Sequence, residues 1–233
     1  LNIENSKISS NSNFSFDIIK DFKIRNLKAT SNIRISEFRY LSKYKKIKKY
    51  LPRYEGQIYF RNNEIDINYS KNNYELIVSS KYSLNNLTDD LNFKIKKLKD
   101  LYNFNFDISL ENNRILLEEL NYLKKQNKKS KLKMLGEYNK NKELVFKKIN
   151  LEEKKNNFNV ENLIISKNFK IVKFDKIVNS YLSKDKIQNN YSIIFRNQNY
   201  ILSGTTYDGI KLLDNMFESD NENFFDIFEN LNN

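Results

Sequence analysis

The side chains that could do chemistry in this sequence are carboxylates and lysines, because histidine and cysteine are both absent. Their absence excludes a Ser-His-Asp triad, a Cys-His pair and a histidine-containing metal site. Asp89-Asp90 and Glu118-Glu119 are adjacent carboxylate pairs. Neighbouring residues on a strand point to opposite faces, so neither pair suits general acid/base catalysis, and we expect both in turns or on a solvated face. The prediction is a chain that is not an enzyme and that uses no cofactor and no metal ion.

A phosphate-binding loop is not indicated either. The four glycines are scattered, and only Gly204 and Gly209 lie near each other. An anion-binding nest ahead of a helix is conceivable at 204–209. We favour a strand end that turns into a capped helix.

The net charge of +12 suggests an anionic partner, but its origin weakens that inference. Only seven of the 41 basic residues are arginine, the side chain that bidentate phosphate recognition favours. Abundant lysine, asparagine, isoleucine, phenylalanine and tyrosine, with few glycines and prolines, is typical of a strongly AT-biased genome. The aromatic residues occupy the same alternating positions as isoleucine and leucine, which describes an apolar face and not exposed platforms for stacked bases. We expect no nucleic acid partner.

Short amphipathic strands account for most of the chain. The clearest runs from Tyr102 to Leu110, where apolar residues alternate with Asn, Asp and Ser. Asparagine-rich clusters such as 61–63, 111–113 and 197–199 separate the runs and predict turns. The predicted fold class is mainly β: a long curved antiparallel sheet of amphipathic hairpins that forms an open apolar groove, with a short helix near the C-terminus. Roughly fourteen strands would give a trough about 65 Å long.

Two internal segments depart from simple alternation. Leu41, Tyr44, Ile47 and Leu51 have helical spacing among lysines, with Pro52 as a stop. A basic amphipathic helix on an anionic membrane surface is one interpretation, and a solvated connection between strands is the favoured one. Segment 115–125 fits a helix or a strand, and we favour a strand because both neighbours are strands.

The organisation changes near Tyr207. Residues 1–207 form the predicted elongated sheet, and residues 208–233 form a short capping helix with an acidic tail or linker. Asp208 can cap a helix, and a second short helix is plausible from Phe224 to Leu231. From Asp214 onward there are six acidic residues and no basic ones.

The sequence begins at Leu1, and we expect it to be a piece of a longer protein. No apolar run approaches the 18 or more residues of a membrane span. Any membrane anchor is therefore expected outside the sequence given.

Three segments contain short motifs of strands and turns. The first is Tyr50-Leu51-Pro52-Arg53-Tyr54-Glu55-Gly56-Gln57-Ile58, which leads into Glu64-Ile65-Asp66-Ile67. The second is 158–165, followed by Lys170-Ile171 and Phe174, and the third is 202–213 with its Gly204, Asp208 and Leu212-Leu213. In combination these segments resemble the central region of YhdP-type proteins of the AsmA-like superfamily. The resemblance covers about Phe22 to Phe217. This chain has fewer Gly and Pro residues in its turns than the family pattern.

The resemblance implies a bridge-like lipid transport protein of the periplasm of a Gram-negative cell, related in architecture to TamB. An apolar β-groove would carry phospholipid acyl chains between the inner and outer membranes. The full-length protein would be anchored to the inner membrane through parts outside this fragment, and adjoining strands of the full-length chain would pair with the sheet edges.

The groove candidates are the alternating apolar residues of these strands. They are Ile58, Phe60, Ile65, Ile67, Leu76, Phe93, Phe104, Phe106, Ile108, Leu132, Phe146, Val160, Ile165, Phe174, Ile193 and Phe195. Each would contact acyl chains through dispersion and burial. The alternative is a structural or adhesive β-sandwich or solenoid in which the same residues pack as a dry core without lipid.

Overall fold

The computed structural model describes residues 6–41, 47–71, 73–139, 142–168 and 170–209. Most of them form one antiparallel sheet of 13 strands. Its strands are β1 (Ile8–Ile19), β2 (Lys23–Leu41), β3 (Gln57–Ser70), β4 (Asn73–Leu84), β5 (Leu87–Leu98), β6 (Leu101–Ser109), β9 (Lys131–Asn139), β10 (Leu144–Glu153), β11 (Asn156–Ile165), β12 (Ile171–Lys173), β13 (Lys176–Leu182), β14 (Gln188–Arg196) and β15 (Asn199–Thr206).

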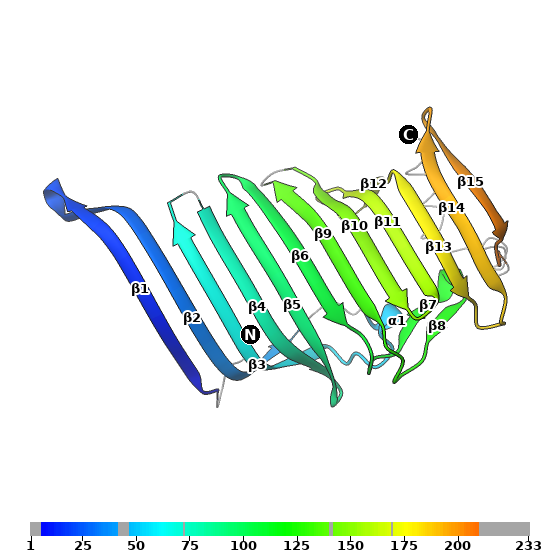
Figure 1. Cartoon of the computed structure of the whole chain (residues 1–233), viewed down its shortest axis with the longest axis horizontal. Coiled ribbons are helices and arrows are strands. Elements are labelled where there is room, and N and C mark those ends of the chain that lie inside the picture. The colour runs from blue at the N-terminus through cyan, green and yellow to red at the C-terminus, as the bar shows by residue number, and fades with distance from the viewer. Residues whose placement is uncertain (1–5, 42–46, 72, 140–141, 169, 210–233) are drawn as a thin grey trace.

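The sheet follows the chain almost in sequence order, and it is open (Figure 1). Its path runs β1-β2-β3-β4-β5-β6-β9-β10-β11-β13-β14-β15, and the short β12 pairs with β11. Among the described strands, β1 and β15 each pair with one neighbour and form the two edges. Twelve strands along this path, spaced about 4.8 Å apart, span about 53 Å. The predicted long antiparallel sheet is confirmed.

Two elements stand outside this sheet. The short helix α1 (Ile47–Tyr50) follows β2, and the hairpin of β7 (Ile115–Leu117) and β8 (Tyr122–Lys124) follows β6. A 3-10 turn at Glu118–Leu120 joins β7 to β8. Figure 1 shows α1 and this hairpin together at the lower end of the strands.

Asparagine bulges keep the apolar side chains on one face of the sheet. In β3, Asn62 has a φ of 51°, and Asn62 and Asn63 together lie opposite a single residue of β4. The bulge reverses the alternation, so Phe60 and Ile65 face the same side despite their odd spacing. The predicted turn at 61–63 was wrong, because the left-handed asparagine makes a bulge within one strand instead of a hairpin. In β11, where Asn162 has a φ of 51°, Val160 and Leu163 also face the same side, and the paired strand β10 has its bulge between Phe146 and Lys148.

The register joins the apolar residues into continuous rows across the sheet. Residues paired on neighbouring strands point to the same face. The central row takes one apolar residue from every strand of the main path except β1: Ile33, Ile65, Val78, Phe93, Phe106, Met134, Ile149, Val160, Ile177, Ile193 and Leu202. We call this side the apolar face and the other side the polar face.

The lower end of the apolar face is covered by α1 with the residues up to Tyr54 and by the β7–β8 hairpin, which together we call the cover. Ile47 and Leu51 pack against the core, and Tyr54 is 2% exposed. The Tyr122 ring lies 4.7 Å from the Phe158 ring of β11, centroid to centroid. The core of the protein therefore sits between the cover and the lower ends of the strands.

The two ambiguous segments both became parts of the cover. The favoured interpretation of 41–51 as a solvated connection was wrong where the structure describes it, because Ile47 and Leu51 are packed against the sheet. Segment 115–125 has strand character at both ends, but β7 and β8 pair only with each other and do not continue the large sheet. The predicted helices after Gly209 and the acidic tail lie outside the described residues.

Candidate functional site: an apolar sheet face

The predicted groove residues lie on one face of the sheet. The register places all of them except Phe174 on the apolar face within strands. Phe174 lies between β12 and β13, with its ring centroid 4.5 Å from that of Tyr200 on β15. Phe104 and Phe174 are buried, and the others are half-buried. The face is thus assembled from residues that are far apart in sequence.

Most of the apolar face has no second layer over it. In the central row Val78 is 7% exposed and Leu202 is 57% exposed, and the remaining members are half-buried. Among the described residues the only other sheet is the two-stranded β7–β8 hairpin, which lies at the lower end. Half-buried aliphatic and aromatic side chains in a row of this length are the feature of the molecule that most needs an apolar partner.

An apolar cavity of about 500 Å³ lies between the cover and the sheet. Its walls are Ile47, Tyr50, Leu51 and Tyr54 from the cover segment, Ile115 and Leu117 from β7, and sheet residues that include Ile58, Phe60, Tyr82, Leu84, Leu91, Ile108, Leu110, Leu132, Ile149, Leu151, Phe158 and Val160. A volume of this size is within the range of small-ligand sites, roughly 300 to 1,000 Å³. The cavity shares Ile149 and Val160 with the central row, so it is continuous with the uncovered part of the face.

An ion pair links the two halves of the cover. The Lys49 ammonium of α1 donates a hydrogen bond to the Glu119 carboxylate in the turn between β7 and β8. That bond is the main reason why the pKa of Lys49 is raised. Both side chains remain partly exposed, so the pair contributes little to stability and chiefly sets the relative position of the two segments.

Asp89 and Lys124 anchor the loop that follows β6. Asp89 is 5% exposed, and its carboxylate accepts hydrogen bonds from the backbone N–H of Asn112 (3.1 Å) and the side-chain amide of Asn113 (2.8 Å). Lys124 is fully buried, and its ammonium donates to the backbone carbonyls of Glu111 (2.8 Å) and Asn113 (2.6 Å) and to that of Leu110. The expectation that the Asp89-Asp90 pair lies in a turn or on a solvated face was wrong for Asp89, because the carboxylate replaces water with backbone and amide donors.

A second buried polar contact ties the hairpin to the end of β15. The side-chain amide of Asn121 donates to the carboxylates of Asp185 (2.6 Å) and Asp208 (3.1 Å). The backbone N–H of Asp208 donates to the side-chain oxygen of Asn189. Tyr207 packs its ring on that of Tyr191, with centroids 4.9 Å apart. Within the described residues, Asp208 therefore holds the chain against the covered core.

The buried tyrosines predict a loss of stability at high pH. Burial raises the pKa of Tyr82, Tyr122 and Tyr181 above the ordinary value of 10.0. Above pH 10 the unfolded chain releases these protons first, so the stability that depends on the protonated tyrosines falls by up to about 1.4 kcal/mol per tyrosine and pH unit. We expect the free energy of unfolding in urea to fall steeply between about pH 10 and 11.5. The Tyr82→Phe variant should show a shallower fall, and equal slopes would contradict the assignment.

The polar face carries cross-strand ion pairs. Lys94 on β5 lies 2.7 Å from Glu75 on β4, and Lys131 on β9 lies 2.8 Å from Asp107 on β6. The Lys94 hydrogen bond is the main cause of a lowered pKa at Glu75. These pairs are solvated and contribute little individually. They make the second face of the sheet a water-facing one.

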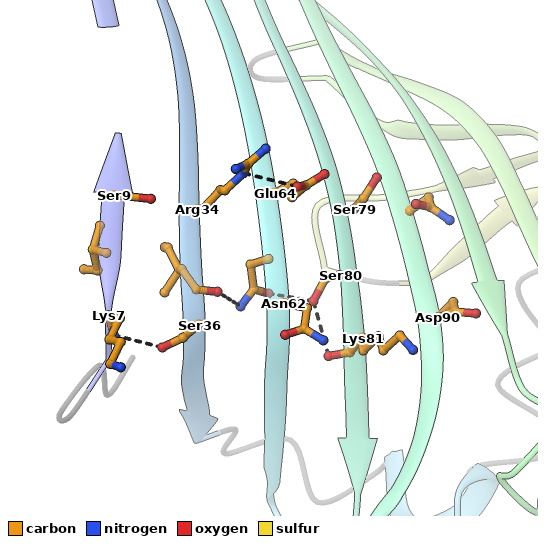
Figure 2. Close-up of a pocket in the computed structure, with 14 residues that line it drawn as sticks. Lys7, Ser9, Arg34, Ser36, Asn62, Glu64, Ser79, Ser80, Lys81 and Asp90 are labelled. Atoms are coloured by element: carbon orange, nitrogen blue, oxygen red, sulfur yellow. Dashed lines mark hydrogen bonds and ion pairs between the residues drawn. The ribbon is translucent and has the colours of Figure 1, made fainter. Parts of the chain in front are cut away.

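A polar hollow of about 750 Å³ surrounds the Asn62 bulge. Figure 2 shows Arg34 beside Glu64 and Lys7 beside Ser36 in this hollow. The Arg34 and Glu64 side chains are 3.2 Å apart, and the Lys7 backbone N–H donates to the Ser36 hydroxyl at 2.8 Å. The charged groups are mixed in sign and partly paired with each other, so the hollow offers no concentrated charge.

The structure adds residues that the sequence analysis did not select. The central row gains Ile33, Val78, Met134, Ile149, Ile177 and Leu202, and the cavity lining gains residues that include Leu91, Leu151 and Phe158. Period-two alternation pointed to Leu91, Met134 and Phe158, but selecting them required the register. Ile149 and Leu151 follow a bulge between Phe146 and Lys148, which hides their phase relative to the preceding residues.

Comparison of this chain with protein-family models, with curated proteins and with solved structures finds no match. Among the described residues, no group of three or more Asp or Glu side chains is arranged to hold a metal ion. No helix in the described part of the chain has the length and hydropathy needed to cross a membrane.

Proposed function

We propose that this chain is a segment of a periplasmic lipid-transfer protein whose apolar sheet face carries phospholipid acyl chains between the inner and outer membranes. The observation that carries the proposal is the continuous central row, which crosses the sheet with most of its members half-buried. Acyl chains would remove that apolar area from water, at about 25 cal/mol for each Å² covered. The resemblance to YhdP-type AsmA-like proteins supports the same assignment. The role is binding and passage along a surface, with no catalytic step.

The sheet edges support a place within a longer groove. β1 contains no lysine or arginine, and β15 contains no charged residue at all, although the chain has 41 basic residues. Exposed edge strands are commonly protected by lysine, proline or inward-pointing charges. We infer that adjoining strands of the full-length chain pair with β1 and β15, and that anchoring to the inner membrane resides in parts outside this sequence.

The proposal predicts that purified chain carries phospholipid and that a charge on the apolar face removes it. Phe106 is in the uncovered centre of the face, and its ring centroid lies 5.5 Å from that of Phe93. A carboxylate there would lose its water without gaining a partner when acyl chains cover it, so we expect the Phe106→Asp variant to lose at least nine-tenths of the lipid seen by native mass spectrometry. Asn105→Asp is the matched control, because Asn105 is exposed on the polar face of the same strand.

Two results would contradict this function. A folded Phe106→Asp chain that keeps its lipid would show that the face does not hold acyl chains. A clean lipid-free mass of the wild-type chain after mild extraction would favour the structural or adhesive alternative. Circular dichroism of both variants separates loss of lipid from loss of fold.

A further inference from the structure

The apolar face ends differently at the two ends of the strands. The turns that join β3 to β4 and β5 to β6 lie at the upper end in Figure 1, and next to them the register pairs four tyrosines and one lysine into a single row, which we call the tyrosine rim. It consists of Tyr69, Tyr74, Lys97, Tyr102 and Tyr138 on five successive strands of the sheet path, β3, β4, β5, β6 and β9. At the lower end, the face runs into the apolar cavity beneath the cover.

The tyrosine rim is chemically amphipathic. Tyrosine offers an apolar ring and a hydroxyl that stays hydrated, a combination suited to the boundary between hydrocarbon and water. Tyr69 is 38% exposed and Tyr138 is 39% exposed. The Lys97 ammonium lies 5.3 Å from the centroid of the Tyr102 ring. Lys97 is the one charged residue of the rim, which therefore combines aromatic rings, hydroxyls and one positive charge.

Further lysines stand in the turns just beyond the rim. Lys71 follows β3 and Lys99 follows β5, and both are exposed. Each of these turns lies at the same end of the strands as the rim. A negatively charged group placed at the rim would therefore meet Lys97 directly and have Lys71 nearby, whereas Lys99 shares its turn with the exposed Asp100.

The opposite end of the face contains almost no polar surface. All 18 residues that line the cavity are apolar or aromatic. The hydroxyl of the lining residue Tyr82 donates to the Ser109 carbonyl, and that of Tyr122 on β8 donates to the Glu153 carboxylate. The Tyr54 hydroxyl is buried without a partner among the described residues. A cavity of this composition suits hydrocarbon and offers little to a charged or hydrated group.

The distance between these two ends matches one acyl chain. On β9 the rim residue Tyr138 is four residues from Met134, which pairs with the cavity residue Ile149, a separation of about 13 Å along the strand. The hydrocarbon core of a bilayer is about 30 Å thick, so the chains of one monolayer span about 15 Å. A lipid with its head at the rim can thus place the methyl end of its chain under the cover.

We propose that the face holds each lipid in one orientation, with an anionic headgroup at the tyrosine rim and the methyl end of the acyl chain in the cavity beneath the cover. The juxtaposition that carries this inference is a tyrosine and lysine row at one end of the strands and a fully apolar cavity at the other. The inference rests on the proposed lipid-transfer function and adds the orientation and the headgroup charge.

Tryptophan quenching tests the orientation, because the chain has no tryptophan of its own. Tyr69→Trp places a fluorophore at the rim, and Tyr50→Trp places one at the cavity, where Tyr50 is 45% exposed. Both are aromatic-for-aromatic changes at partly exposed positions, so the fold should be kept. Tyr59→Trp is the control, because the alternation with Phe60 puts Tyr59 on the polar face.

The probes are phosphatidylglycerol and phosphatidylcholine brominated near the glycerol or near the terminal methyl of the chain. We expect methyl-end bromine to quench Tyr50→Trp at least threefold more than Tyr69→Trp, near-glycerol bromine to show the reverse, and Tyr59→Trp to respond to neither. Half-quenching should need at least threefold less phosphatidylglycerol than phosphatidylcholine.

The outcomes separate this inference from the proposed function. Lipid that quenches both apolar-face variants equally, or in the reversed order, overturns the orientation while lipid binding stands. Equal affinity for the two lipids overturns the anionic headgroup. Absence of quenching in all variants, together with a lipid-free mass of the wild-type chain, overturns the proposed function itself.

Discussion

Replacement of Lys124 by methionine is expected to lower the free energy of unfolding by about 3 to 5 kcal/mol. Lys124 is fully buried, and its ammonium donates to the carbonyls of Leu110, Glu111 and Asn113. Methionine has a similar length but no donor, so three carbonyls lose their partner. Each buried group left without a hydrogen bond costs about 1 to 3 kcal/mol. The favourable charge interaction with Asp89 is lost as well.

The pH dependence gives this prediction a signature of its own. Burial lowers the pKa of Lys124 to about 8, from an ordinary value of 10.5. Between these values the unfolded chain binds more protons than the folded one, so the wild-type stability contributed by this group rises with pH. The difference between wild type and Lys124→Met should therefore be larger at about pH 9.5 than at pH 7, in a range where the tyrosines are still protonated.

Urea denaturation of the neighbouring Lys125→Met variant is the control. Lys125 is exposed, and its replacement should change stability by no more than about 0.5 kcal/mol. Equal losses in the two variants, or a Lys124→Met difference that does not change with pH, would show that the buried hydrogen bonds do not hold the loop. Limited proteolysis within 110–130 should accelerate in Lys124→Met alone, because Lys124 holds the loop that leads into the β7–β8 hairpin of the cover.

Period-two alternation was sufficient to predict the strands and the existence of one apolar face. The run from Tyr102 to Leu110 has an unbroken phase, and β6 covers nearly all of it. Alternation was not sufficient where a bulge changes the phase. Between Phe60 and Ile65, the sequence Arg-Asn-Asn has the composition of a hairpin turn, and an asparagine with positive φ serves either a turn or a bulge.

The cover could not be predicted because it depends on contacts between distant segments. Lys49 and Glu119 are separated by 70 residues, and Asn121 and Asp208 by 87. No local pattern shows that Ile47 packs on a sheet or that a lysine in segment 115–125 is buried. A charged residue is normally solvated, and the exceptions at Asp89 and Lys124 arise only where a folded loop supplies enough hydrogen-bond partners.

The tyrosine rim illustrates the same limit for the candidate site. Each tyrosine was visible as an alternating apolar position, equivalent to isoleucine or leucine. Only the register of five strands shows that Tyr69, Tyr102 and Tyr138 share a row with Lys97. Residues that line the apolar face can therefore be told from residues at its boundary only when the pairing of the strands is known.

Replacement of Gly136 by alanine is expected to lower the free energy of unfolding by about 3 kcal/mol, although it adds one carbon. A Cβ at this position would lie 2.3 Å from the Val145 carbonyl oxygen and 2.4 Å from Cζ of Phe104. The phenyl ring can move, but the carbonyl belongs to the backbone of β10 beside its bulge. Relief of that contact requires a shift of the β9–β10 register in the middle of the sheet.

Phe104 fills the space above Gly136, and its ring reaches across Gly136 to Phe146 on β10. Its ring is 9% exposed and lies edge-on to Phe146, with centroids 5.4 Å apart. Phe104→Ala alone should cost about 3 to 5 kcal/mol through lost burial and the cavity left behind. The double variant should be less destabilised than the sum of the two single variants by about 1 kcal/mol, because the smaller side chain at 104 removes one of the two clashes.

Thermal and urea denaturation of the two single variants and the double variant measures this coupling. Leu135→Ala is the control, since Leu135 is 46% exposed on the polar face of the same strand. Exact additivity would mean that the Phe104 ring does not confine Gly136, and a Gly136→Ala chain as stable as wild type would mean that β10 can move away from β9 without cost. A coupling of the expected sign would locate the constraint in the packing of this ring, so that the size of residue 136 and the shape of the apolar face are fixed by the same contact.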